Sequence, residues 1–222
     1  KNIEEKLQQY RNSLEVIANN TVILKTLTDE TMNPYDRGKV VSQEVDNSLL
    51  LEIQSEVRNC MIYSSVQDCK IYGRRASMMQ QASREVWYLQ ERAMEDDWFS
   101  YFALKDSEPI LSLVKDIEAL DTEHLSRSQL GIIKLDVAMK RLFVPAATGG
   151  DESATYDVIV YKNEGEDARI LYQTVKNNGN EILKKYWEDT VTKKDGANSN
   201  GQISTYTVDG QTLEDYGLNL LV

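Results

Sequence analysis

A group of aromatic side chains with one arginine is the part of this sequence best suited to chemistry. Trp87 and Tyr88 follow Arg84 by three and four residues, which places all three on roughly one side of a helix expected over residues 77–97. The full candidate set adds rings from two predicted strands and comprises Tyr72, Arg84, Trp87, Tyr88, Trp98 and Tyr101. Aromatic walls with a few polar groups suit a small-molecule pocket, and an arginine can bind a carboxylate through two hydrogen bonds. The set predicts ligand binding, although the same rings could instead fill the core between helix and sheet.

Catalysis has little support in this sequence. His124 is the only histidine and lies in the polar stretch DTEHLSRS, so we interpret it as an exposed loop residue. The motifs G-x-S-x-G, G-x-x-x-x-G-K and G-x-G-x-x-G are absent. The loop containing Gly201 fails as an EF-hand, because its first and last ligand positions would be Gly196 and Thr207. We expect no enzyme activity, no metal and no cofactor in this chain.

The composition narrows the class of protein. The chain has 222 residues, of which 41% are hydrophobic, and a formal net charge of −11. This length suffices for one large domain or for two small ones with cores of their own. The negative charge disfavours nucleic acid and anionic membrane surfaces, because their phosphates would repel the chain. No apolar run of about 18 residues occurs and the chain begins at Lys1, so we expect a piece of a longer protein.

Two helices are predicted ahead of the aromatic group. An apolar seam with alternating spacings of four and three predicts one long helix over residues 1–28, through Ile3, Leu7, Tyr10, Leu14, Ile17, Thr21 and Leu24. This helix could serve the core of the fold alone or could also form a parallel dimer seam. A second helix is expected to open at Asn33-Pro34, with apolar residues at every fourth position from Val41 to Val57.

Five strands are predicted to form an antiparallel, PAS-like sheet around the aromatic helix. Residues 60–66 and 70–72 suggest a hairpin with its turn near Gln67. In that hairpin Cys60 and Cys69 would not lie opposite each other, so a disulfide is doubtful and two half-buried thiols are the alternative. The three remaining strands are expected over residues 98–104, 109–118 and 129–136.

The rest of the chain predicts a second, smaller subdomain. Asp136 ends the fifth strand, and we interpret it as the cap of a short helix over residues 137–143. After the loop ATGGDESA, strands are expected over residues 156–161, 169–173, 202–208 and 213–222, with a helix over 180–190. The predicted fold class is α+β, with a long N-terminal helix packed along two PAS-like antiparallel-sheet subdomains. The expected boundaries are 1–57 for the helical pair, 58–143 for the first sheet subdomain and 144–222 for the second.

This order of elements resembles the double-Cache ectodomains of membrane receptors, most closely those of YesM-like sensor histidine kinases. The resemblance is carried by the Trp87-Tyr88 pair, by ILSLVKDI at residues 110–117 and by LGIIKLDVAMKRL at 130–142. It implies an extracellular sensor flanked by transmembrane helices absent from this chain. The apolar seam of the N-terminal helix predicts that the intact receptor works as a homodimer through that helix. The membrane-distal subdomain would bind a small solute or a solute-loaded binding protein, and the kinase part would lie in the cytoplasm.

The sequence departs from the amino-acid-binding members of that family at two positions. Those members carry an arginine two residues before the Trp-Tyr pair, whereas Arg84 lies three residues before Trp87. They also carry an aspartate shortly after a tyrosine on the next strand, where Ala103 follows Tyr101 by two residues. Asp136 could replace that aspartate, although we favour a capping role for it. Alternative readings are the ectodomain of a chemoreceptor or cyclic-dinucleotide enzyme, and a free extracellular binding protein.

Overall fold

The computed structural model of the chain divides into two compact units, Lys1–Val144 and Pro145–Val222. The structure describes residues 3–49, 51–91, 98–105, 108–121, 126–142, 158–164, 167–174, 179–184, 201–203, 206–208, 210–213 and 218–221. Within these ranges, no helix has both the length and the apolar character needed to cross a membrane.

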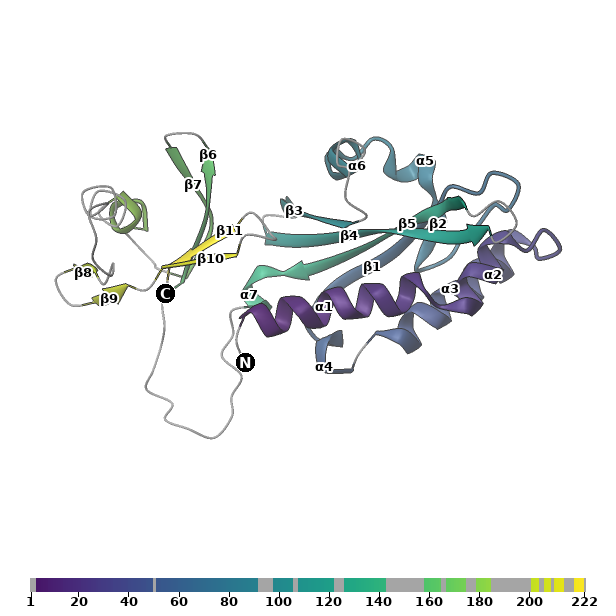
Figure 1. Cartoon of the computed structure of the whole chain (residues 1–222), viewed down its shortest axis with the longest axis horizontal. Helices are drawn as coiled ribbons and strands as arrows, with labels where there is room; N and C mark the ends of the chain where they lie inside the picture. Colours follow the sequence, from purple (N-terminus) through teal and green to yellow (C-terminus); the bar gives the residue numbers. More distant parts are fainter. Residues whose placement is uncertain are drawn as a thin grey trace. The chain divides into compact units, whose positions relative to one another are not determined.

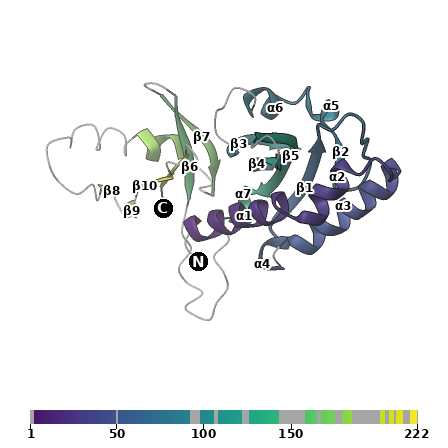
Figure 2. The same cartoon turned by 45° about the vertical axis from the view of Figure 1, so that its right-hand side comes forward.

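The first unit is built on a five-stranded sheet with helices on both faces (Figure 1 and Figure 2). Across the sheet the strands run in the order β2 (Ala76–Met78), β1 (Val57–Ser64), β5 (Ser126–Ala138), β4 (Glu108–Asp121) and β3 (Trp98–Lys105). One face carries α1 (Ile3–Ala18), α2 (Thr21–Thr28) and α3 (Pro34–Ser48). The opposite face, which we call the α6 face, carries α5 (Met79–Ala82) and α6 (Val86–Glu91). The strands predicted at residues 98–104, 109–118 and 129–136 are therefore confirmed.

The burial of β5 shows that both faces of the sheet are covered. A strand with one solvated face alternates between buried and exposed residues, but β5 is buried without interruption from Leu130 to Ala138. It lies between β1 and β4 and pairs antiparallel with each of them. Any polar side chain in this stretch is thus held away from bulk water, on one face or the other.

The single long helix predicted over residues 1–28 is wrong, because the chain breaks at Asn19 and Asn20. The Asn20 side chain accepts hydrogen bonds from the backbone N–H groups of Val22 at 2.9 Å and Ile23 at 3.2 Å, and so begins α2 as an N-cap. The apolar seam of α1 faces the core of the unit, with Leu7, Tyr10, Leu14 and Ile17 each at most 1% exposed. These side chains therefore form part of the core of the first unit.

We expect Leu14→Glu to destabilise the first unit by about 3 kcal/mol or more, because it places a charge where an apolar side chain is 1% exposed. The matched control is Val16→Glu on the same helix, since Val16 is 54% exposed and its replacement should change stability by roughly 0.5 kcal/mol at most. Urea denaturation followed by circular dichroism measures both variants. Equal losses in the two variants would contradict the assigned orientation of α1.

The predicted start of the second helix, at Asn33-Pro34, is confirmed. Asn33 caps α3 by accepting hydrogen bonds from the backbone N–H groups of Tyr35 at 3.1 Å and Asp36 at 3.0 Å. Pro34 occupies the first turn, where its missing N–H costs nothing. The helix ends at Ser48, and the short helix α4 (Leu51–Gln54) follows it before β1.

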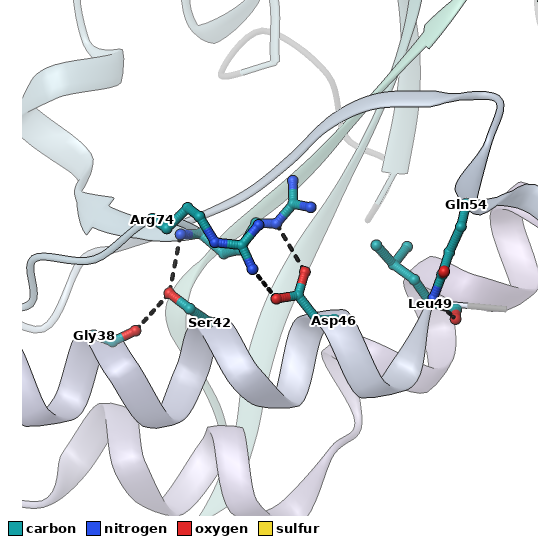
Figure 3. Close-up of polar contacts among 7 residues, drawn as sticks. Gly38, Ser42, Asp46, Leu49, Gln54 and Arg74 are labelled. Carbon is teal, nitrogen blue, oxygen red and sulfur yellow. Dashed lines mark hydrogen bonds and ion pairs between the residues drawn. The ribbon is translucent and has the colours of Figure 1, made fainter. Parts of the chain in front are cut away.

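The hairpin predicted over residues 60–72 is wrong, since β1 pairs with β2 in parallel and the intervening loop returns along α3. Gly38 and Gly73 allow this return: a Cβ atom on Gly38 would lie 2.0 Å from the carbonyl oxygen of Tyr72. Figure 3 shows polar contacts of α3 in this region. Ser42 Oγ donates to the Gly38 carbonyl at 2.6 Å, and Asp46 forms an ion pair with Arg74 of the loop. The contact between Asp46 and Arg74 joins residues 28 positions apart, so a local hairpin pattern cannot report it.

The buried side chain of Arg37 forms hydrogen bonds to the same loop. Its side chain is 2% exposed, and its guanidinium donates to the backbone carbonyls of Thr26 at 3.1 Å and Met32 at 2.8 Å. Further hydrogen bonds reach the carbonyls of Asp29 and Lys70. One buried cation therefore joins the end of α2, the start of α3 and the loop before β2.

Cys60 and Cys69 are free thiols, 0% and 1% exposed respectively. Burial raises the pKa of the Cys60 thiol from its ordinary value of 9.0 to about 12. Between these two pH values the folded thiol keeps its proton while the unfolded one loses it. The free energy of unfolding should therefore fall as the pH rises through this window.

We also expect a thiol reagent such as DTNB to react with neither cysteine at neutral pH until urea unfolds the chain. Fast labelling of the native chain would contradict this burial.

The second unit contains a four-stranded antiparallel sheet. Its strands lie in the order β10 (Gly210–Leu213), β11 (Leu218–Leu221), β6 (Ile159–Glu164) and β7 (Asp167–Gln173). Residues 179–184 are helical, and β8 (Gly201–Ile203) pairs with β9 (Tyr206–Val208) as a separate ribbon. In place of the single strand predicted over residues 202–208, the structure has two short strands that pair antiparallel with each other.

Candidate functional site

The polar groups most deeply buried on the α6 face belong to neighbouring positions of β4 and β5. Ser112 and Asp136 are paired in the ladder between these strands, and each is 2% exposed. Ser112 Oγ donates to Asp136 Oδ1 at 2.6 Å, and the Lys134 ammonium donates to the same oxygen. Lys134 is 9% exposed and lies two residues before Asp136, hence on the same face of β5. A buried ion pair with a hydroxyl partner therefore lies within the sheet.

An aromatic group covers this ion pair. Trp87 of α6 is 2% exposed, and the centre of its ring lies 5.5 Å from Lys134 Nζ, a distance at which the ring face attracts a cation. Tyr63 of β1 packs against Trp87 with ring centres 5.4 Å apart, and Tyr88 meets it edge-on at 5.9 Å. The cover is completed by apolar contacts to Met79, Ala82, Val114 and Ile132.

Burial and one hydrogen bond determine the state of the rings that cover the ion pair. Burial raises the pKa of Tyr63 to about 12, with smaller contributions from the carboxylates of Glu85 and Asp136. Tyr63 is therefore neutral at physiological pH and keeps a hydroxyl donor. Trp87 Nε1 donates to Glu85 Oε2 at 2.6 Å, which holds the indole in place at the start of α6. The arrangement can stabilise a cation between a carboxylate and an aromatic face.

The structure brings together only part of the residue set predicted for the site. Trp87 and Tyr88 lie in it, but Arg84 is exposed in the turn that separates α5 from α6, so the predicted continuous helix over residues 77–97 is wrong. Tyr72 lies before β2 and packs against Tyr35 of α3 at 6.0 Å. Trp98 and Tyr101 lie in β3, paired with Lys115 and Ser112 of β4. The side chains of these two residues are outside the described part of the structure.

The interpretation of Asp136 as a helix cap is also wrong. Strand β5 continues through Ala138, and α7 (Met139–Leu142) begins three residues after Asp136. Asp136 is instead the acceptor of the buried ion pair. Ser112 and Lys134 were missed as site residues, although one signal was present. Lys134 and Asp136 are opposite charges two residues apart in an apolar strand, where neither could be buried without a partner.

The fold defines an α+β protein of the PAS-like kind, which confirms the predicted fold class. The chain is similar to the periplasmic domain of LuxQ from Vibrio cholerae, with a TM-score of 0.50 and 11% sequence identity over 99% of this chain and 92% of that one. At this level of identity the likeness concerns the fold alone. Neither a protein-family model nor a curated protein matches the chain.

Proposed function

We propose that this chain is the extracytoplasmic sensor domain of a membrane-anchored histidine kinase, of the YesM-like double-Cache type. Two observations support the proposal. The fold is shared with a periplasmic domain along almost the whole chain, and a buried ion pair lies under an aromatic helix on the α6 face. In this proposal the chain itself has no enzyme activity. It binds a small solute, or a solute-loaded binding protein, and biases two arrangements of the receptor.

The coding frame around this chain tests the proposal most directly. We expect a membrane-spanning segment on each side of the chain and a histidine kinase region after the second segment. A chemoreceptor region or a cyclic-dinucleotide enzyme in that place would keep the sensor role and change the output. A frame without membrane segments would contradict the proposal and favour a free extracellular binding protein.

A thermal-shift screen of the purified chain against sugars, amino acids, organic acids, nucleosides and polyamines tests solute binding. A ligand at 100 times its Kd should raise the Tm of a chain of this size by roughly 5–10 °C. We expect the shift to be lost in Tyr88→Ala, whose ring packs edge-on against Trp87, and kept in Tyr72→Ala, whose ring packs against Tyr35 instead. A shift kept in both variants would place the ligand elsewhere.

We also propose that the receptor works as a homodimer through its N-terminal helix. Because Leu7, Tyr10 and Leu14 face the core, the contact would use the opposite side of α1, where Val16 is 54% exposed. In the membrane-anchored receptor, Val16→Cys should then cross-link between subunits under oxidation, whereas Leu14→Cys should not. Equal cross-linking in both variants, or in neither, would exclude this side of the helix.

A further inference from the structure

A cavity of about 360 Å³ lies where the end of α1 meets the paired strands β4 and β5. Its volume falls within the range of about 300–1,000 Å³ that small-molecule sites occupy in proteins. The last turn of α1 forms one wall, and residues of β4 and β5 form the other. These lining residues differ from those of the ion pair and the aromatic group on the α6 face. The cavity is therefore a second candidate site of the first unit.

An ion pair between α1 and β4 lines one side of this cavity. Lys115 Nζ lies 3.0 Å from Glu15 Oε1, and the Lys115 side chain is only 10% exposed. The Asn19 amide donates to Glu15 Oε2 at 3.3 Å and to the Glu15 carbonyl at 2.9 Å. The carboxylate of Glu15 is therefore held in place before any ligand arrives. Because a carboxylate oxygen accepts more than one hydrogen bond, Glu15 can still accept one from a ligand.

A second ion pair lines the cavity on the strand side. Arg127 Nη1 of β5 lies 3.2 Å from Glu118 Oε2 of β4. A guanidinium carries several N–H donors, so Arg127 can bind a ligand oxygen while it holds this carboxylate. Leu120 pairs with Arg127 across the two strands and is 63% exposed, which adds apolar surface beside the ion pair. The cavity thus offers two pairs of neighbouring donors and acceptors together with an apolar contact.

The pairing of charges inside the cavity favours a neutral ligand over an ion. A charged ligand would have to compete with Lys115 for Glu15, or with Arg127 for Glu118, whereas a neutral one leaves both ion pairs intact. Asp116 also lines the cavity, and its carboxylate accepts a hydrogen bond from Gln129 Nε2 at 2.7 Å. Two hydroxyl groups on adjacent carbons match an ion pair well, because one donates to the carboxylate while the other accepts from the cation. Hydrogen bonds of this kind, with one charged partner, are stronger than those between neutral groups.

We propose that this cavity binds a neutral polyhydroxylated compound, a monosaccharide or disaccharide, through the ion pairs Glu15–Lys115 and Glu118–Arg127. Hydroxyl groups of the sugar contact the two ion pairs, and a C–H face of its ring packs against Leu120. The proposal goes beyond the sensor function proposed above, because the site is formed by other residues than the aromatic group and holds whether or not the chain belongs to a receptor.

Isothermal titration calorimetry of the full 222-residue chain tests the proposal. The probes are ribose, xylose, glucose, galactose, maltose and lactose, with spermidine and citrate as charged comparisons. Millimolar concentrations are used, because the general stabilisation of proteins by sugars requires far higher ones and does not saturate. We expect at least one sugar to bind saturably at a single site, and more tightly than either charged probe.

Two variants place the bound sugar in the cavity. Glu118→Ala and Arg127→Ala should each raise its Kd by roughly tenfold or more, the loss expected for a hydrogen bond to a charged group. Both variants should stay folded, because this ion pair is exposed, with side chains 32% and 72% accessible. Asp46→Ala and Arg74→Ala are the matched controls, since that pair is 33% and 65% exposed and does not line the cavity. The Kd should not change in either control.

Each outcome supports or overturns the proposal. Sugar binding that is weakened in Glu118→Ala and Arg127→Ala, and kept in Arg74→Ala and in Tyr88→Ala, supports it. Absence of binding by every sugar overturns it, as does tighter binding of spermidine or citrate in the same cavity. Sugar binding that is lost in Tyr88→Ala and kept in Glu118→Ala also overturns it, and would place the sugar at the α6 face instead. This last result separates the present proposal from the solute site proposed for the sensor.

Discussion

Arg37→Ala is expected to lower the free energy of unfolding by about 3–5 kcal/mol, which would be one of the largest single losses available in this chain. The guanidinium is 2% exposed and donates to four backbone carbonyls, those of Thr26, Asp29, Met32 and Lys70. Its removal leaves these acceptors without their donor in the interior. Urea denaturation followed by tryptophan fluorescence measures the loss.

Two further variants make the Arg37 prediction specific. Arg37→Lys should keep most of the defect, because one ammonium cannot reproduce the planar fork of donors. Arg74→Ala is the matched control: its side chain is 65% exposed in the ion pair with Asp46, and an exposed pair contributes about 1 kcal/mol or less. A loss in Arg37→Ala as small as that in Arg74→Ala would show that the buried hydrogen bonds do not hold the loop.

Asp136→Ala is also expected to lower the free energy of unfolding by about 3–5 kcal/mol. The reason is that it leaves the Lys134 ammonium buried without its counter-charge. The double variant Lys134→Met/Asp136→Val should recover most of this loss, since an apolar pair of similar volume removes both charges together. The same denaturation experiment measures both variants. A double variant no more stable than Asp136→Ala would show that the ion pair contributes more than charge balance.

The exposed pair of Arg127 and Glu118 is the matched control for the buried one. These side chains are 72% and 32% exposed and lie 3.2 Å apart on the same two strands, β5 and β4. Glu118→Ala should therefore cost about 1 kcal/mol or less. Similar losses in Glu118→Ala and Asp136→Ala would contradict the argument that burial, and not pairing alone, determines the cost.

Sequence patterns were reliable where local chemistry decides the structure. The start of α3 follows from Asn33 and Pro34, whose side chains act within one turn of their own positions. Strands β3, β4 and β5 follow from apolar residues bounded by polar turns. The break at Asn20 was also local, since its side chain caps α2, but the apolar seam concealed it. Periodicity alone cannot report such a break, because the capped helix continues the same spacing.

Only the tertiary structure decided the pairing of β1 with β2 and the composition of the candidate site. The parallel pairing depends on the close approach of Gly38 to the carbonyl of Tyr72, which no local pattern encodes. Asp136 is paired with Lys134, and Lys134 lies against the ring of Trp87, which is 47 positions away on another element. By itself, the sequence determined the α+β class and the aromatic helix segment. The partners of each buried polar group depend on which distant elements exclude water around it, and that is a property of the packed fold.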